Sequence, residues 1–416
     1  MKLTKLSLVA ALAVSAAFAG GDIAPVEPVV EAPAPVANNC TSCGTVTGTV
    51  KLWYGTNDAG TNDLFSKGGA WGDAYADVKY SRKVMDNVTL NLGAAYLSTL
   101  GLESDLVSGT WVNHGPNGLD DAAWINEANV VIGLPSVSSF LKIGRQELDT
   151  PFFFSEKWSI ATNTFDAAVL GNTSLPDTTL IAAWVGRGNG ANGVGTGNVS
   201  LNNTNFGGGH VKFAGNNPAY AFGAINKSFT DTTLAAWYYR IPGVAQAYWL
   251  QADTSLMGFT LGAQYAAAEV LATNADTNAW AVKLGYDMDA LNLYAAYSDR
   301  SNDAGIDISN IATGHTAGSQ SNLYTEAYWN YGLVSAQDAQ SFAVGASYDL
   351  GMAKLGAQYT NVDGIAGGTG DLSEIALTAS AKLGPVNADL AYLNSEVGNN
   401  DSDNTVLIML SMPYSL

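Results

Sequence analysis

Residues 88–97 read VTLNLGAAYL, a stretch that alternates apolar side chains with small or polar ones. The apolar members of this series are Val88, Leu90, Leu92, Ala94 and Tyr96. A period of two predicts a β-strand, because successive side chains of a strand point to opposite faces. Such a strand separates either a protein core from water, or lipid from a water-filled lumen, and the rest of the chain decides between these two settings.

The first nineteen residues have the pattern of a secretory signal peptide. Lys2 and Lys5 give a positive start, residues 6–18 form an apolar run, and Ala17-Phe18-Ala19 has the small-residue form of a cleavage site. The run is too short to cross a hydrocarbon layer of about 30 Å as a helix. We therefore expect residues 1–19 to be removed and the mature chain to be exported.

The composition indicates a protein whose outer surface carries few charged residues. Hydrophobic residues make up 47% of the 416 residues and charged residues only 13%, about half of the roughly 25% usual for soluble domains. The net charge is −19, and −21 without the two lysines of the signal. An acidic chain without a basic patch is not expected to bind nucleic acid. It is expected to concentrate cations near itself.

Residues 20–44 are predicted to be a Pro-rich periplasmic linker that precedes a single domain over 45–416. The linker holds the only cysteines, Cys40 and Cys43. In an oxidising compartment, such a pair favours a local disulfide. Haem attachment would need a histidine where Gly44 stands, a metal site would need more ligands, and a thioredoxin-like role would need a βαβ context.

From Thr45 onward, alternating segments of about ten residues recur, separated by Gly, Asn, Asp and Pro. Tilted strands that cross a membrane need about 9–11 residues, whereas globular strands have a mode near 5–6. The connections alternate between short and long, as in barrels with periplasmic turns and outer loops. Residues 210–213 (HVKF) are assigned to a loop because counting them would break this alternation. The eighteen predicted strands are 45–54, 72–82, 88–97, 124–134, 139–145, 165–171, 178–187, 219–228, 232–241, 245–254, 259–270, 278–287, 291–299, 340–349, 353–362, 372–383, 386–396 and 404–416.

The face of these segments opposite the apolar side chains is polar but carries few charges. Such a face suits a water-filled lumen better than the outer surface of a soluble protein. The final segment, TVLIMLSMPYSL, alternates to the last residue. We expect it to pair with the first strand, because an unpaired edge cannot lie in lipid. The fold class is therefore all-β, a transmembrane antiparallel up-and-down barrel of about 18 strands. The predicted pore-lining residues are Lys51, Asp77, Lys79, Glu127, Lys142, Lys283, Lys354, Lys382 and Asp389.

The third long connection, RQELDTPFFFSEKWSIATNTF (145–165), combines charged residues with three adjacent phenylalanines. Three phenylalanines in a solvated loop would be unfavourable, so we expect the loop to fold into the barrel and pack against its wall. The alternative is an outward loop that packs on its neighbours or on a second subunit.

GRQELDTP (144–151), followed by NTFDAAVL (163–170), resembles the OprD-like porins, and most of all the Campylobacter-type major outer membrane porins. The resemblance covers roughly 45–416. It implies an outer-membrane barrel of eighteen strands, assembled as a homotrimer, whose third loop forms the constriction. The chain departs from the family in its thinly spread lysines and in ending at Leu416 rather than Phe. The constriction charges that the resemblance implies are Arg145, Glu147, Asp149, Glu156 and Lys157.

The sequence thus predicts a passive channel for small hydrophilic solutes, with a preference for cations and for neutral or zwitterionic solutes. Its expected partners are outer-membrane lipids, lipopolysaccharide and further copies of the chain. No cofactor, metal or catalysis is expected, because His114, His210 and His315 form no recognisable site. A surface adhesin with a plugged lumen, an outer-membrane hydrolase and a secreted soluble β-protein are the alternatives.

Overall fold

The computed structural model describes residues 44–109, 122–158, 160–189, 210–212, 217–303, 305–311, 319–365 and 370–416. No helix in these ranges is long and apolar enough to cross a membrane.

The short elements are the two-residue strands β6 (Asp149–Thr150), β7 (Phe153–Phe154) and β10 (Val211–Lys212), and the 3-10 turns η1 (Lys67–Gly69), η2 (Leu102–Ser104), η3 (Pro135–Val137) and η5 (Tyr331–Leu333). The eighteen long strands are β1 (Thr45–Asn57), β2 (Ala70–Met85), β3 (Val88–Ser98), β4 (Ala122–Leu134), β5 (Ser139–Gln146), β8 (Phe165–Asn172), β9 (Thr178–Gly188), β11 (Ala219–Asn226), β12 (Thr232–Ile241), β13 (Ala245–Leu256), β14 (Phe259–Val270), β15 (Ala275–Met288), β16 (Leu291–Arg300), β17 (Gln340–Asp349), β18 (Ala353–Asp363), β19 (Leu372–Leu383), β20 (Val386–Val397) and β21 (Asp403–Ser415).

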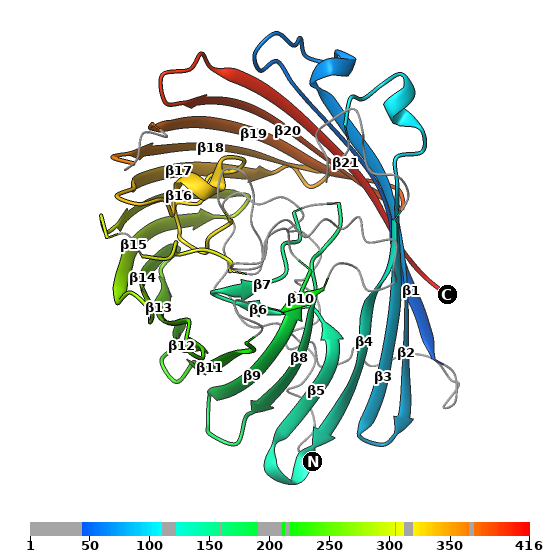
Figure 1. The fold of residues 1–416 in the computed structure, drawn as a ribbon, viewed down its shortest axis with the longest axis vertical. Helices are drawn as coiled ribbons and strands as arrows, with labels where there is room; N and C mark the ends of the chain where they lie inside the picture. The colour runs from blue at the N-terminus through cyan, green and yellow to red at the C-terminus, as the bar shows by residue number, and fades with distance from the viewer. Residues whose placement is uncertain are drawn as a thin grey trace.

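The long strands form one antiparallel sheet that closes on itself (Figure 1). Each strand pairs with its neighbours in sequence, and β1 pairs with both β2 and β21. Lys51 on β1 therefore lies opposite Tyr75 on one side and Ser411 on the other. Every long strand is thus paired with a neighbour on both sides, which confirms the predicted barrel.

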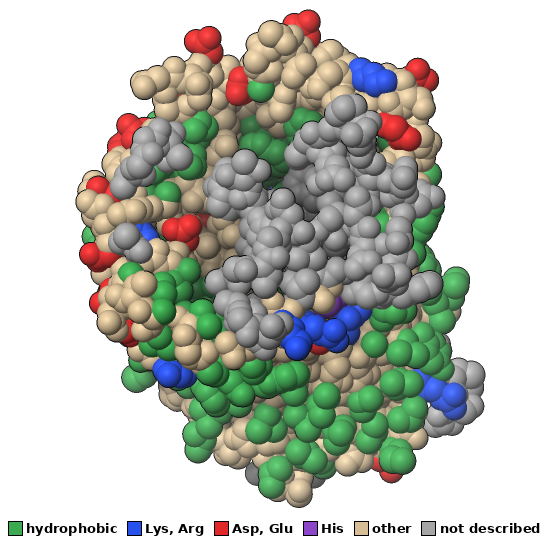
Figure 2. All heavy atoms as spheres, viewed as in Figure 1, with side chains coloured by type: hydrophobic (Ala, Val, Ile, Leu, Met, Phe, Trp, Pro, Cys, Tyr) green, Lys and Arg blue, Asp and Glu red, His purple; other side chains and the backbone are tan. Residues whose placement is uncertain are grey.

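The two faces of the wall differ as the alternation predicts. On β3, Leu92 and Tyr96 are 46% and 43% exposed on the outside, whereas Ala95 is 3% exposed on the inside. On the inner face, Ser81 Oγ donates to Asn91 Oδ1 at 2.7 Å, and Asn91 Nδ2 donates to Asn129 Oδ1 at 2.9 Å. Figure 2 shows hydrophobic side chains covering the outer wall below the barrel opening. An apolar exterior around a polar interior is the arrangement of a barrel that spans lipid.

Short turns join the strands at one end of the barrel, and the other end carries the long loops together with the short connections 242–244 and 271–274 (Figure 1). Between β13 and β14, the whole turn is Met257-Gly258, with φ of 54° and 84°. Two consecutive residues with positive φ match the twist of an antiparallel hairpin, and glycine adopts this conformation without strain. The opposite end carries the connections over 147–164, called loop 3, and over 301–339, called loop 7.

All eighteen predicted strands are present, with boundaries that differ by a few residues. The expectation that 210–213 lie in a loop is corrected for Val211 and Lys212, which form β10 and pair with Gly188 and Arg187 of β9. With two residues, β10 is too short to cross a membrane and leaves the alternation of turns and loops intact. The predicted signal peptide and all of the predicted linker except Gly44, with Cys40 and Cys43, lie outside the described residues.

The apolar core of the molecule lies inside the barrel, between the wall and loops 3 and 7. It comprises loop residues such as Phe152, Phe153 and Leu323, and wall residues such as Trp237 and Trp249. The inner face therefore carries apolar packing where these loop residues lie against the wall.

Candidate functional site

Loop 3 is anchored to the inner wall by its phenylalanines. The Phe152 ring meets Tyr239 of β12 and Trp249 of β13 edge to face, at centroid distances of 5.2 and 5.7 Å. Phe153 packs on Phe165 of β8 at 6.5 Å. Phe152 and Phe153 are 2% and 1% exposed, so removal of their apolar surface from water stabilises the loop against the wall.

A small hairpin gives loop 3 its shape. β6 pairs with β7, and Thr150 Oγ1 both donates to Phe153 O at 2.9 Å and accepts from Phe153 N at 3.2 Å. Ser155 N donates to Leu148 O at 2.7 Å, which closes the base of the hairpin. These bonds hold the charged positions Glu147 and Asp149 close to the buried phenylalanines.

The charged residues of loop 3 meet lysines from two directions. Glu147 Oε1 lies 3.4 Å from Lys79 Nζ of β2, and Glu147 Oε2 lies 3.5 Å from Lys157 Nζ within the loop. Burial acts to raise the pKa of Glu147, but the charges of Lys79 and Lys157 outweigh it, so the pKa lies below its usual value. Burial raises the pKa of Asp149 to about 6, against the opposing charge of Lys157 and with a contribution from Glu147.

Loop 7 lies against loop 3 and was not predicted to do so. Asn310 Nδ2 donates to Phe154 O at 2.9 Å and to Glu156 Oε1 at 3.2 Å, and Asn310 Oδ1 accepts from Phe154 N at 3.4 Å. Ile311 N donates to Phe152 O at 3.1 Å. Since Asn310 is fully buried, it joins the two loops by bonds that water does not replace easily.

Further bonds tie loop 7 to the wall at β13 and β19. Tyr324 OH donates to Asp253 Oδ1 of β13 at 2.6 Å. Both carboxylate oxygens of Glu374 on β19 accept backbone N–H groups, from Trp329 and from Asn330, each at 3.0 Å. Loop 7 therefore contacts loop 3, β13 and β19 inside the barrel.

Two buried carboxyl groups contribute to this packing. Glu326 accepts hydrogen bonds from the backbone and hydroxyl of Ser321, and burial raises its pKa well above the usual value. Glu156 accepts from Asn310 and from Trp158 Nε1 at 3.3 Å. Among the carboxyl groups predicted at the constriction, Glu156 therefore bonds loop 3 to loop 7. Glu147 and Asp149 instead lie close to the lysines described above.

The structure places the nine predicted pore-lining residues on the inward face of their strands, alternating with exposed apolar neighbours such as Val50, Val78 and Val282. Lys51 lies over the Tyr75 ring at 5.5 Å, and Lys283 lies between Tyr294 and Tyr324 at 5.3 and 5.9 Å. Near loop 3, the inward charges of the wall are Lys51, Asp77, Lys79, Glu127 and Lys142.

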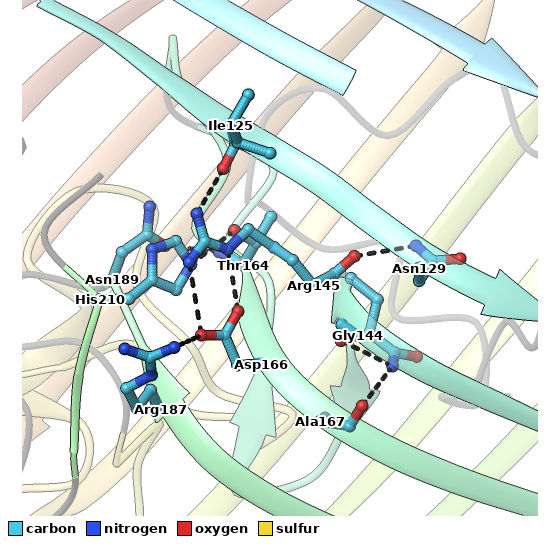
Figure 3. Close-up of polar contacts among 11 residues, drawn as sticks. Ile125, Asn129, Gly144, Arg145, Thr164, Asp166, Ala167, Arg187, Asn189 and His210 are labelled. Atoms are coloured by element: carbon cyan, nitrogen blue, oxygen red, sulfur yellow. Dashed lines mark hydrogen bonds and ion pairs between the residues drawn. The ribbon is translucent and has the colours of Figure 1, made fainter. Parts of the chain in front are cut away.

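Arg145 lies apart from the other four residues predicted at the constriction. In the register of β5 with β8, Leu141, Ile143 and Arg145 share one face, and Ile143 is exposed on the outer wall. The Arg145 side chain reaches from β5 toward both neighbouring strands, β4 and β8 (Figure 3). Its guanidinium donates to both oxygens of Asp166 at 2.9 and 3.3 Å, and to Ile125 O at 2.8 Å. We therefore assign Arg145 to the outer side of the wall.

No family model matches the sequence, and no curated protein matches it. Among solved structures, the chain is similar to Pseudomonas aeruginosa OpdK, crystallised with vanillate, at 15% identity and a TM-score of 0.70, covering 90% of this chain and 99% of that one. Pseudomonas aeruginosa OccK9 (OpdG) has 13% identity, a TM-score of 0.71 and coverage of 90% and 98%. Acinetobacter baumannii OccAB4 has 11% identity, a TM-score of 0.68 and coverage of 90% and 99%.

At these identities, the likeness establishes a shared fold over nearly the whole of each chain. OpdK is an outer membrane protein, and the common fold agrees with the OprD-like part of the resemblance. The finer resemblance to Campylobacter-type porins stays a prediction.

Proposed function

We propose that this chain is an outer-membrane porin that lets small hydrophilic solutes and ions diffuse through its lumen. The observation that carries the proposal is the closed barrel whose exposed exterior is apolar and whose interior is lined by charged side chains. Charged groups on an inner face need water or a partner. Barrels of this strand number are wide enough to hold water.

Loops 3 and 7 together form the proposed constriction. The supporting contacts are those of Phe152 with the wall and of Asn310 with loop 3. The free passage then runs past the charged group that Glu147, Asp149 and Lys157 of loop 3 form together with Lys79 of the wall. Solutes are selected by size at this narrow point and by charge in a low-dielectric ring.

Cation preference is the proposed selectivity. Loop 3 holds the carboxylates Glu147, Asp149 and Glu156 against the single cation Lys157, since Arg145 belongs to β5. The whole chain carries a net charge of −19. Lys79 offsets part of this charge at Glu147. The reversal potential across a planar bilayer in a salt gradient tests the selectivity, and anion preference would contradict it.

A plugged barrel that acts as a surface adhesin is the second candidate. The specific observation in its favour is the extent to which the described part of loop 7 packs inside the barrel, with Leu323, Ala327 and Val334 fully buried. Single-channel recording separates the two functions, because a porin gives stepwise current at low voltage and a plugged barrel gives none.

Assembly as a homotrimer in contact with outer-membrane lipids and lipopolysaccharide is also proposed, on the family resemblance. The mass of the detergent-solubilised protein by light scattering tests the subunit number. A monomeric mass at micromolar protein concentration would contradict the trimer without affecting the proposed channel.

A further inference from the structure

A charged cluster lies on the outer face of the wall, close to the loop end of β5, β8 and β9. Asp166 lies opposite Arg145 in one register and opposite Arg187 in the other. On the same face of these two strands, Leu141 lies opposite Leu170, and Leu170 is 42% exposed. Cross-strand partners share a face, so the charged side chains face away from the lumen.

Asp166 binds both arginines. Its Oδ1 lies 2.9 Å from Arg145 Nε, and its Oδ2 lies 2.6 Å from Arg187 Nη2 (Figure 3). The Arg145 side chain is 12% exposed and that of Arg187 is 49% exposed. Arg145 therefore balances Asp166 within the wall, and Arg187 presents its remaining N–H groups to the surroundings of the barrel.

A further cation joins Arg187 on the same face. Lys212 of β10 is exposed and lies opposite Arg187 in the β9 register. His210, two residues earlier, is within hydrogen-bond distance of Thr164 Oγ1 at 3.1 Å. In Figure 2, Lys and Arg side chains gather above the hydrophobic outer wall. We call Arg187 and Lys212, with the Arg145–Asp166 pair behind them, the outer cationic patch.

Aromatic residues indicate the height of this patch relative to a membrane. Trp184, on the outer face of β9, is 45% exposed and lies three residues before Arg187. On neighbouring strands, Tyr238 stacks on Phe222 at 6.5 Å and packs on Tyr248 at 5.1 Å. Exposed aromatic residues of this kind form girdles at the level of lipid headgroups. The patch therefore lies at or just beyond the headgroups of the outer leaflet.

The outward residues near the loop ends of β14, β15 and β16 differ in charge from this patch. On β14, β15 and β16, the outward positions near the loop end carry Glu269, Asp276 and Asp299, with Asp299 opposite the exposed Trp280. Although the whole chain has a net charge of −19, the outer face near the loop end thus carries cations at β9 and β10. A phosphate group matches the patch, because arginine binds phosphate oxygens through parallel N–H groups and lysine adds a point charge.

We propose that the outer cationic patch binds a phosphate group of a phosphorylated glycolipid in the outer leaflet. Arg187 and Lys212 contact the phosphate, and the Arg145–Asp166 pair orients Arg187. The inference rests on the proposed membrane location but not on conduction through the lumen.

The test measures lipid binding to the purified full-length barrel in detergent. The patch variant is R187Q/K212Q, and the matched control is K83Q/K227Q, which removes two exposed lysines near the opposite end of the barrel. The probes are bisphosphorylated lipid A and the same lipid without its phosphates, followed by native mass spectrometry. Binding of the phosphorylated probe should fall about tenfold in the patch variant and stay unchanged in the control. The dephosphorylated probe should bind all three proteins equally.

Two outcomes would overturn the proposal. One is equal binding of phosphorylated lipid A to the patch variant and the control. The other is loss of subunit association in R187Q/K212Q with lipid binding unchanged, which would place the patch at an interface between copies of the chain. Single-channel conductance of R187Q/K212Q should equal that of the wild type, because the patch faces away from the lumen. Failure of lipid binding with normal conductance would therefore leave the proposed function intact.

Discussion

Lys79 Nζ of strand β2 lies 3.4 Å from Glu147 Oε1 of loop 3, so a salt bridge joins the barrel wall to the loop that folds inside it. Lys157 approaches the second oxygen of the same carboxylate at 3.5 Å. Both lysines and the carboxylate remain partly exposed, so this group lies where permeating solutes are expected to pass.

Replacing Glu147 with Gln should shift the channel toward anions. The change leaves Lys79 and Lys157 without their shared carboxylate, which makes the local potential more positive. We expect the cation-to-anion permeability ratio to fall several-fold, as measured by reversal potential in a salt gradient. K83Q removes a charge on an exposed site outside this group and should leave the ratio unchanged. An E147Q ratio equal to that of the wild type would exclude Glu147 from the selectivity region.

Cation preference should depend on pH with a midpoint near 6. The pKa of Asp149 is raised to about 6, so the group is neutral below this pH and negatively charged above it. The pKa of Glu147 is lowered, so Glu147 stays charged across the same window. Cation selectivity should therefore rise between pH 5 and pH 7 in the wild type. In D149N this step should disappear, and persistence of the step would assign it to another group.

The fold was largely predictable from the sequence, because lipid imposes a simple requirement on each strand. Segments such as 259–270 have to present apolar residues on alternate positions, and the predicted and observed bounds of this strand agree. Strand ends beyond the membrane have no such requirement, which explains why 72–82 underestimates β2 at Ala70–Met85. The placement of Arg145 was also accessible, since it continues the outward series of Leu141 and Ile143.

Loop 7 could not be placed in the same way. Its contacts depend on side chains that are distant in sequence, such as Asn310 with Phe154 and Tyr324 with Asp253. No period in the sequence encodes such pairs. The one available signal was composition, because buried aromatic residues such as Tyr328 and Tyr331 would be unfavourable in a solvated loop.

Replacing Asn310 with Ala should loosen the constriction. Asn310 makes three hydrogen bonds to loop 3, and breaking buried bonds of this kind costs about 1–3 kcal/mol per unsatisfied group. Conductance and current noise should both increase in N310A, and larger neutral sugars should enter liposomes that contain it.

The melting temperature of the barrel should change little in this variant, because the interstrand ladders are untouched. N322A, which removes the single bond from Asn322 Nδ2 to Pro151 O, should have a smaller effect on conductance. Wild-type conductance and noise in N310A would show that loop 7 does not limit the passage.

Exchanging two adjacent residues of β15 tests the assignment of faces without changing composition. In V282K/K283V, a lysine replaces the outward Val282, which is 44% exposed. A lysine facing lipid near the middle of a strand costs about 2–4 kcal/mol. We therefore expect a clear loss of folding yield in lipid vesicles, measured by the heat-dependent shift of the folded band in gel electrophoresis. The control K283V keeps the outer face intact and should fold nearly as well as the wild type.

The most direct test of the central claim combines single-channel recording with cysteine labelling at two neighbouring positions of β5. Cys40 and Cys43 are first replaced by Ser, and K142C on the inner face is compared with I143C on the outer face, where Ile143 is 45% exposed. A charged, water-soluble thiol reagent should lower the current of K142C in discrete steps and leave I143C unaffected. Absence of any current, or equal reaction of both positions, would contradict a water-filled lumen enclosed by a lipid-facing wall.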